Sequence, residues 1–157
     1  MLAALNTSII DNTEETVFQL ASDALKKDRD FVLSAVKIDA RAIQFADETV
    51  QADKEIAIAA ITSTPQLFEY LPTELTNDKQ IAKLAVSRWG PMLKFVSERL
   101  KFDHDVVTMA VKLKHPDTFD HVPERLQYDP EIRRMAGFDG DVLRDAPMWI
   151  KNDQEAV

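Results

Sequence analysis

A repeating unit of about 25 residues constrains the fold of this 157-residue chain more than any other feature of its sequence. Five segments begin with an aspartate and carry a large apolar residue three positions later and an alanine seven positions later. The aspartates are Asp28, Asp53, Asp78, Asp103 and Asp129. Offsets of three and seven place the apolar residue and the alanine on one face of an α-helix. The repeat therefore predicts stacked helical units without a β-sheet.

The first half of each unit predicts a helix that begins one residue after the aspartate and runs for roughly ten residues. The aspartate suits the N-cap position, because its carboxylate can accept hydrogen bonds from the free N–H groups of the first turn. Acidic residues two positions later complement the positive end of the helix dipole. The alanine column indicates close approach between neighbouring helices, so we expect five buried alanines: Ala35, Ala60, Ala85, Ala110 and Ala136.

The second half of each unit predicts a shorter second helix followed by a separate turn. Its apolar positions recur between units, as in AIQFADETV and LFEYLPTEL. Pro65, Pro91 and Pro116 stand at or near the start of this helix, where a missing N–H costs nothing. Pro72 and Pro123 then interrupt it, so we expect the PTEL and PERL segments to form a short turn of 3₁₀ type.

These units predict one all-α domain over residues 1–157, an α-solenoid of about five 25-residue helix-turn-helix repeats with capping ends. Residues 1–27 are expected to form an N-terminal cap, because residues 17–28 repeat only the second-half pattern. The full repeats are expected at residues 28–52, 53–77, 78–102 and 103–128, and a partial repeat with a C-terminal cap at residues 129–157. Caps at both ends favour a complete protein over a fragment of a longer array.

The C-terminal segment departs from the repeat after Ala136. We expect Met148, Trp149 and Ile150 to fold back over the last repeat, and the final residues to fray. The handedness of the superhelix stays open.

The pattern L-x-x-D-x-[DE]-[IVF]-x-x-x-A-V, present as LKKDRDFVLSAVK and LKFDHDVVTMAVK, resembles the repeat family known as domain of unknown function 4116, over residues 17–138. The stretch HVPERLQYDPEIRRMA also resembles the leucine-rich repeat variant, whose units pair an α-helix with a short 3₁₀ helix in a right-handed superhelix. That family's prolines are present in only some copies, since Asp47 and Ser97 stand where Pro72 and Pro123 do. Both resemblances imply a helical repeat fold, and neither implies catalytic residues.

Composition narrows the classes of function. The chain has no cysteine, so it forms neither disulfides nor thiolate zinc sites and suits a reducing compartment. Its three glycines leave no room for a Gly-rich phosphate loop. The N-terminal segment lacks the features of a signal peptide, and no run of 18 apolar residues occurs, so we expect a cytoplasmic protein without membrane contact.

No catalytic or metal-binding constellation is evident. The three histidines, His104, His115 and His121, do not follow a metal-ligand spacing such as H-E-x-x-H. The paired carboxylates lack the apolar surroundings that would raise a pKa for acid–base work. We therefore expect no metal, no cofactor and no enzymatic activity.

Charge singles out one repeat. The chain has 27 acidic and 19 basic residues, a formal charge of −8 that disfavours general attraction to nucleic acid or anionic membranes. Residues 78–102, in contrast, carry six basic and two acidic residues, and Trp89 stands between the two expected helices of this repeat. Tryptophan and arginine are enriched at binding hot spots. The candidate partner-binding residues are therefore Lys83, Arg88, Trp89, Lys94 and Arg99, the alternative being that Trp89 packs on its own helix pair.

The positions directly after the aspartates form a second candidate, a short basic ladder of Arg29, Lys54, Lys79 and His104. An acidic column runs beside it, at Asp30, Glu55, Asp105 and Glu131. Such charge lines are typical of solvated helix ends, and the alternative is a groove that follows a phosphate backbone.

We therefore expect a non-catalytic scaffold that binds a protein partner, as an adaptor, regulator or inhibitor. One alternative is nucleic-acid contact through the basic repeat 78–102. The other is an acidic inhibitor that imitates nucleic acid, as small phage proteins do, and occupies the basic cleft of a nucleic-acid enzyme. The oligomeric state stays open.

Overall fold

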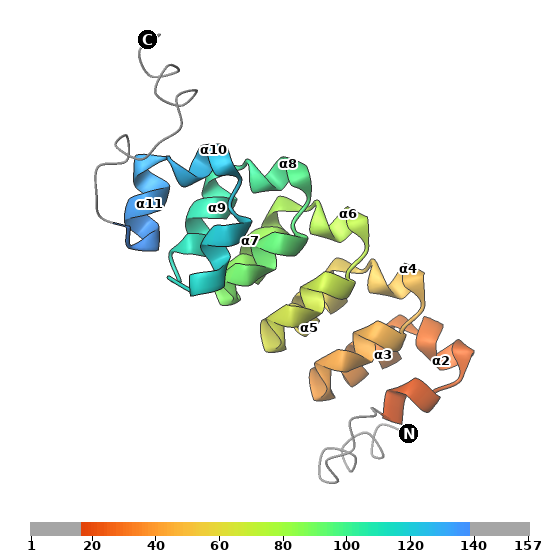
Figure 1. Ribbon diagram of the computed structural model, residues 1–157. Helices are drawn as coiled ribbons and strands as arrows, with labels where there is room; N and C mark the ends of the chain where they lie inside the picture. Colours follow the sequence, from red (N-terminus) through yellow and green to blue (C-terminus); the bar gives the residue numbers. More distant parts are fainter. Residues whose placement is uncertain (1–16, 139–157) are drawn as a thin grey trace.

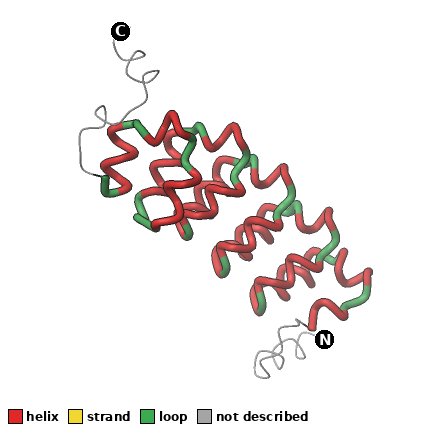
Figure 2. The backbone as a smooth tube through the Cα atoms, in the orientation of Figure 1, coloured by secondary structure: helices red, strands yellow, loops and turns green. Residues whose placement is uncertain are grey.

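The structure of the protein, a computed structural model, describes residues 17–138, which form a stack of helices without a β-strand in that range (Figures 1 and 2). The long helices lie side by side along the stack. Each begins one residue after a repeat aspartate, as predicted: α3 (Arg29–Ile38), α5 (Lys54–Ser63), α7 (Lys79–Arg88), α9 (His104–Val111) and α11 (Pro130–Ala136).

The aspartate before each long helix is its N-cap, which confirms the prediction. The Asp53 carboxylate accepts hydrogen bonds from the backbone N–H groups of Glu55, at 2.9 Å, and Ile56, at 3.2 Å. These bonds satisfy two donors that the first helical turn cannot pair internally. Equivalent bonds are accepted by Asp28, Asp78, Asp103 and Asp129.

The second half of each repeat differs from the prediction in its helix types. The expected second helix is a six-residue 3₁₀ helix: η2 (Ala40–Phe45), η3 (Pro65–Tyr70), η4 (Gly90–Phe95) and η5 (Pro116–His121). The segment predicted as a 3₁₀ turn is a single turn of α-helix: α4 (Glu48–Gln51), α6 (Thr73–Thr76), α8 (Glu98–Lys101) and α10 (Glu124–Gln127). Each repeat thus contains three helical segments in the predicted order, and only the types of the two shorter segments differ from the expectation.

Geometry explains why the second segment can be a 3₁₀ helix. Side chains three residues apart lie above one another in a 3₁₀ helix, so one side of a two-turn segment can be buried. In η4, for example, Gly90 and Leu93 are both buried. Pro72 and Pro123 do not break a helix interior. They are the N-cap residues of α6 and α10, where no intrahelical N–H bond is needed.

The non-proline residues at this N-cap position link consecutive repeats through the backbone. The N–H of Asp47 donates to the carbonyl oxygen of Lys26 at 3.0 Å, and the N–H of Ser97 donates to that of Thr76 at 3.4 Å. Pro72 and Pro123 lack this donor. The alternation of proline and non-proline residues therefore changes the backbone bonding between repeats without changing the helix order.

The hydrophobic core runs along the stack between the long helices and the 3₁₀ helices. Four of the five repeat alanines are at most 1% exposed: Ala35, Ala60, Ala85 and Ala110. Ala136 is only half-buried, so the expectation of five buried alanines is wrong at this position. Ala136 lies on α11, the last helix in residues 17–138, and no described repeat follows to cover it.

Substituting Ala85 tests the close packing of the alanine column. Ala85→Leu is expected to lower the free energy of unfolding by about 1–3 kcal/mol, because the larger side chain overpacks the contact between neighbouring long helices. Lys79→Ala, on the same helix with a side chain 43% exposed, is expected to change it by less than about 0.5 kcal/mol. Urea denaturation monitored by circular dichroism measures both, and equal effects would contradict the assigned faces.

At the N-terminal end, the described residues repeat the second-half pattern of the other units. Residues before the first long helix form η1 (Val17–Leu20) and α2 (Asp23–Lys27), the same 3₁₀ and short α pair as in the repeats. The predicted fold-back of Met148, Trp149 and Ile150, and the fraying of the last residues, lie outside the described residues. None of the helices in residues 17–138 has the length and apolarity needed to cross a membrane.

Candidate interaction surface

The predicted basic ladder is a series of ion pairs that connect consecutive repeats. The Nζ of Lys54 lies 2.6 Å from Oδ2 of Asp78, and the Nζ of Lys79 lies 2.8 Å from Oδ2 of Asp103. Each ladder side chain thus meets the N-cap aspartate of the next repeat. Arg29 pairs with Asp53 at 2.8 Å, and the His104 ring lies 3.6 Å from Asp129 at the equivalent position.

These contacts change the titration of the paired groups. The hydrogen bond from Lys54 lowers the pKa of Asp78, and that from Arg29 lowers the pKa of Asp53. Hydrogen bonds to Asp103 and Asp105 raise the pKa of Lys79. A phosphate backbone could bind the ladder only by displacing these carboxylates, so the ladder joins repeats and does not form a free basic groove.

The structure separates the five predicted partner-binding residues between the two edges of the stack. One edge holds the starts of the long helices and the short helices α4, α6, α8 and α10 (Figure 1). Arg99 lies on this edge, in α8, and donates to the carbonyl oxygen of Asn77 at 3.2 Å. Arg88 ends α7, and Trp89 follows it at the opposite edge. The ten residues of α7 place its two ends about 15 Å apart.

The remaining two predicted residues lie between these edges on different helices. Lys83, in the middle of α7, has its Nζ 3.8 Å from Oδ2 of Asp105. Lys94, in η4, has its Nζ 5.5 Å from the centroid of the Phe95 ring. The structure therefore does not bring all five residues into one patch. Of the five, only Arg88 and Trp89 are adjacent.

Trp89 contacts the next repeat. Its ring meets the His115 ring edge-on, with centroids 4.4 Å apart and planes at 63°. Trp89 and His115 occupy the same position in their repeats, as the N-caps of η4 and η5. Trp89 is also 36% exposed, so packing accounts for only part of its surface.

Gly90 permits a close approach between the two repeats beside Trp89. A Cβ at Gly90 would lie 2.8 Å from the carbonyl oxygen of Ala110 and would also collide with the Thr118 hydroxyl. The other repeats have Ala40, Pro65 and Pro116 at this position. The absence of a side chain at Gly90 therefore lets η4 lie against α9, which contains Ala110, and against η5, which contains Thr118.

Exposed cations gather around this contact, at the ends of the long helices. The loop after α9 contains Lys112, Leu113 and Lys114, all exposed, and Leu113 is 47% exposed. Within residues 17–138, Arg88, Lys112 and Lys114 form no ion pair. We define the Trp89 edge as the surface formed by Arg88, Trp89, Lys112, Leu113, Lys114 and His115.

The sequence prediction of the site did not include Lys112, Leu113 or Lys114. A signal for them is present in the sequence, because repeat 103–128 is one residue longer than the other three repeats. In the structure Lys114 has a φ of 53°, the left-handed conformation that non-glycine residues adopt mainly in turns. The insertion therefore marks a distinct turn at the Trp89 edge.

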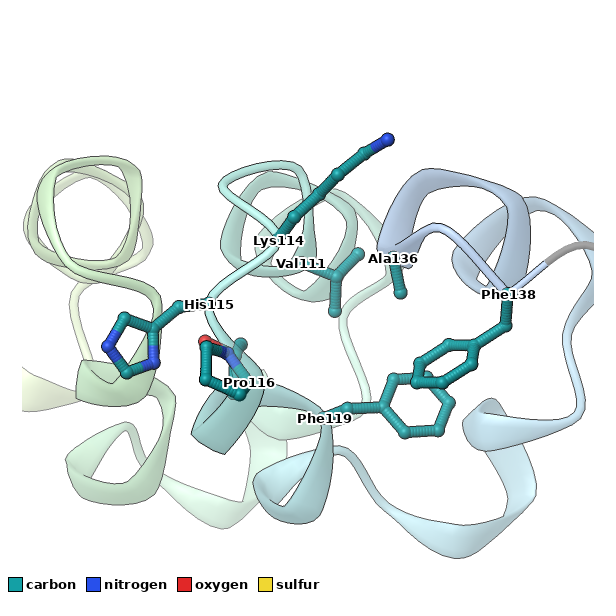
Figure 3. Close-up of a pocket in the computed structure, with 8 residues that line it drawn as sticks. Val111, Lys114, His115, Pro116, Phe119, Ala136 and Phe138 are labelled. Carbon is teal, nitrogen blue, oxygen red and sulfur yellow. The ribbon is translucent and has the colours of Figure 1, made fainter.

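A pocket of about 170 Å³ adjoins the Trp89 edge at the end of the described stack (Figure 3). The rings of Phe119 and Phe138 lie together on one side of it, with centroids 4.6 Å apart, and the Lys114 side chain extends away from it. The wall also includes Val111 and Ala136, which makes the pocket largely apolar. In residues 17–138, no group of three or more histidine and acidic side chains could hold a metal ion.

A comparison with family models found a match to a domain of unknown function (DUF4116), at residues 8–51, 28–76, 53–90 and 78–127. The four matches overlap, follow the repeat along the chain and together cover more than half of it. Comparisons with curated proteins and with solved structures found no significant match.

Proposed function

We propose that this chain, which belongs to the repeat family of the domain of unknown function (DUF4116), is a non-catalytic cytoplasmic scaffold that binds a protein partner. The description of the family assigns no activity, so the proposal rests on the surface of the chain itself. The Trp89 edge is the proposed contact. In stacked repeats the loops along one edge are displayed together and commonly form the binding face.

One observation carries this proposal: Arg88 and Trp89 stand next to each other, both exposed, beside further unpaired cations. Tryptophan and arginine are the residue types that most often dominate the energy of protein interfaces. Arg88 has no carboxylate partner in residues 17–138, so a partner's carboxylate could pair with it without displacing another. Binding at this edge suits an adaptor, a regulator or an inhibitor.

Nucleic-acid contact has less support as the function. The ladder cations already pair with aspartates of the next repeat, as Lys54 does with Asp78. The basic residues of repeat 78–102 also lie on different edges and helices, so they do not form one track along which a phosphate backbone could run.

Alanine substitution at the Trp89 edge tests the proposal. A partner captured by cross-linking in the native source and identified by mass spectrometry would be purified, and its affinity measured by isothermal titration calorimetry. The double variant Arg88→Ala/Trp89→Ala is expected to lose at least about 2 kcal/mol of binding free energy, the level of a hot spot. Its helical content should not change, because neither side chain belongs to the buried hydrophobic core of the stack.

A matched control removes the same kinds of side chain elsewhere. Lys37→Ala/Tyr70→Ala deletes an exposed cation and an exposed aromatic ring from repeats 28–52 and 53–77, and should leave the affinity unchanged. A partner that binds the Arg88→Ala/Trp89→Ala variant as tightly as the wild type would refute the proposed contact.

A further inference from the structure

The two edges of the stack differ in charge. The starts of the long helices carry exposed carboxylates, with side-chain exposures of 95% at Asp30 and 61% at Glu55 and Asp105. The opposite edge carries the cations of the Trp89 edge, Arg88, Lys112 and Lys114. Glu55 and Asp105 pair with Arg29 and Lys79, but carboxylates outnumber cations at these helix starts, so an acidic ligand would be repelled at this edge and attracted at the other.

The cations of the Trp89 edge are available for a ligand, unlike those of the ladder. Lys79 contacts both Asp103 and Asp105, whereas Arg88 and Lys112 have no acidic partner in residues 17–138. Among the described residues, the acidic group that pairs with this edge is Asp117, whose Oδ2 lies 3.9 Å from Nδ1 of His115. In a chain with a formal charge of −8, such unpaired cations offer charge complementarity to carboxylates.

Apolar side chains are exposed next to these cations in the chain. Trp89 is 36% exposed and Leu113 is 47% exposed, and the two residues belong to equivalent turns of adjacent repeats. An apolar side chain could cover them while flanking carboxylates pair with the cations. The guanidinium of Arg88 can bind a carboxylate through two parallel hydrogen bonds, which adds specificity for orientation.

The cations are interrupted along the stack by repeat 53–77, which separates the Trp89 edge from Lys37, the residue equivalent to Lys112 in repeat 28–52. The residues equivalent to Lys112 and Leu113 in repeat 53–77 are Thr62 and Ser63, which are uncharged. A nucleic-acid backbone presents charge at a regular spacing and is bound by basic residues along its path. The limited extent of the Trp89 edge fits a short acidic segment better than an extended polyanion.

We propose, as a consequence of the proposed function, that the Trp89 edge recognises an acidic segment of a partner protein that carries an apolar anchor residue. Carboxylates of the segment pair with Arg88, Lys112 and Lys114, and its anchor packs on Trp89 and Leu113.

Fluorine NMR of the whole chain labelled with 5-fluorotryptophan tests this recognition. The chain has two tryptophans, and Trp149→Phe assigns the two signals. The first probe is a synthetic peptide of glutamate and serine around a central Leu-Phe pair. The second replaces its glutamates by glutamine, the third replaces the Leu-Phe pair by serines, and the fourth is oligothymidylate of equal charge.

The first peptide is expected to shift the Trp89 signal and to bind at least about tenfold more tightly than the second or the third, since charge and anchor act together. Arg88→Glu/Lys112→Glu should weaken this binding by at least about tenfold, because the reversed charges repel the peptide. Lys37→Glu, a reversal of a cation outside the Trp89 edge, should leave it unchanged.

Each contrary result has a separate meaning. Equal binding of the acidic and glutamine peptides would overturn the acidic recognition and leave the proposed function standing. Tighter binding of oligothymidylate than of the first peptide would assign the edge to nucleic acid and overturn the inference. If no probe moves the Trp89 signal, the inference is overturned. The proposed function fails only when an identified partner binds the Arg88→Ala/Trp89→Ala variant as tightly as the wild type.

Discussion

Replacing Ile81 by alanine is expected to lower the free energy of unfolding by about 2–5 kcal/mol, and the same change at Ile132 by less. The two side chains occupy the same position in their repeats and are equally buried, at 1% and 0% exposure. Ile81 lies on α7, which has a long helix on either side, whereas Ile132 lies on α11, which contacts α9 on one side. In a stacked array each repeat contacts only its neighbours, so a central repeat contributes two interfaces to stability.

Urea denaturation measures how much stability each substitution removes, and amide hydrogen exchange shows which helices lose protection. Ile81→Ala should lower the protection of α5, α7 and α9 together, because it weakens both interfaces of the central repeat. Ile132→Ala should lower protection mainly in α11. Equal losses from the two substitutions would show that the domain unfolds as one unit whose ends are as strongly coupled as its centre.

The long helices could be predicted from the sequence because their signals are local. An aspartate that caps the first turn and an apolar face at helical spacing both lie within one helix, as at Asp78 and Ile81. The second-half segments contain only six residues. Over so short a length an apolar pair three residues apart, such as Gly90 and Leu93, fits an α-helix as well as a 3₁₀ helix. The types of the shorter helices therefore could not be read from periodicity.

The arrangement of the candidate site could be predicted only in part, because it depends on how the repeats stack. Arg88 and Trp89 are neighbours in the chain, and both lie exposed at one edge as the loop position suggested. Arg99 belongs to the same repeat but lies across the length of a helix from them. Trp89 and His115 are in different repeats, and their contact follows from the lateral distance between stacked units, which no single repeat specifies.

The same stacking explains why the basic ladder is paired. Within one repeat, Lys54 follows the aspartate that caps its helix, and the two look like a solvated helix end. Stacking places the Lys54 side chain beside Asp78, the N-cap of the next helix. The charges that seemed free in the linear sequence therefore pair across each junction between repeats, whereas Arg88, Lys112 and Lys114 at the opposite edge form no ion pair within residues 17–138.

The repeat architecture itself predicts that removing one whole period preserves the fold, whereas removing half a period abolishes it. Deleting residues 54–78 joins Asp53 to Lys79, so Asp53 becomes the N-cap of α7 and the next 3₁₀ and short helices follow in the same order. The contact of Arg29 with Asp53 can form as before. One repeat and one interface are lost, so the midpoint of urea denaturation should fall while the helical content per residue is retained.

Deleting residues 54–66 is the control, because it begins at the same residue and removes fewer residues, but breaks the period. Asp53 would then precede Leu67 and Phe68, which belong to a 3₁₀ helix, and the shortened unit would have no long helix to cover its neighbours. This variant is expected to lose cooperative unfolding and most of its ellipticity at 222 nm. A half-period deletion that folds as well as the deletion of residues 54–78 would show that the stack does not depend on the phase of the 25-residue unit.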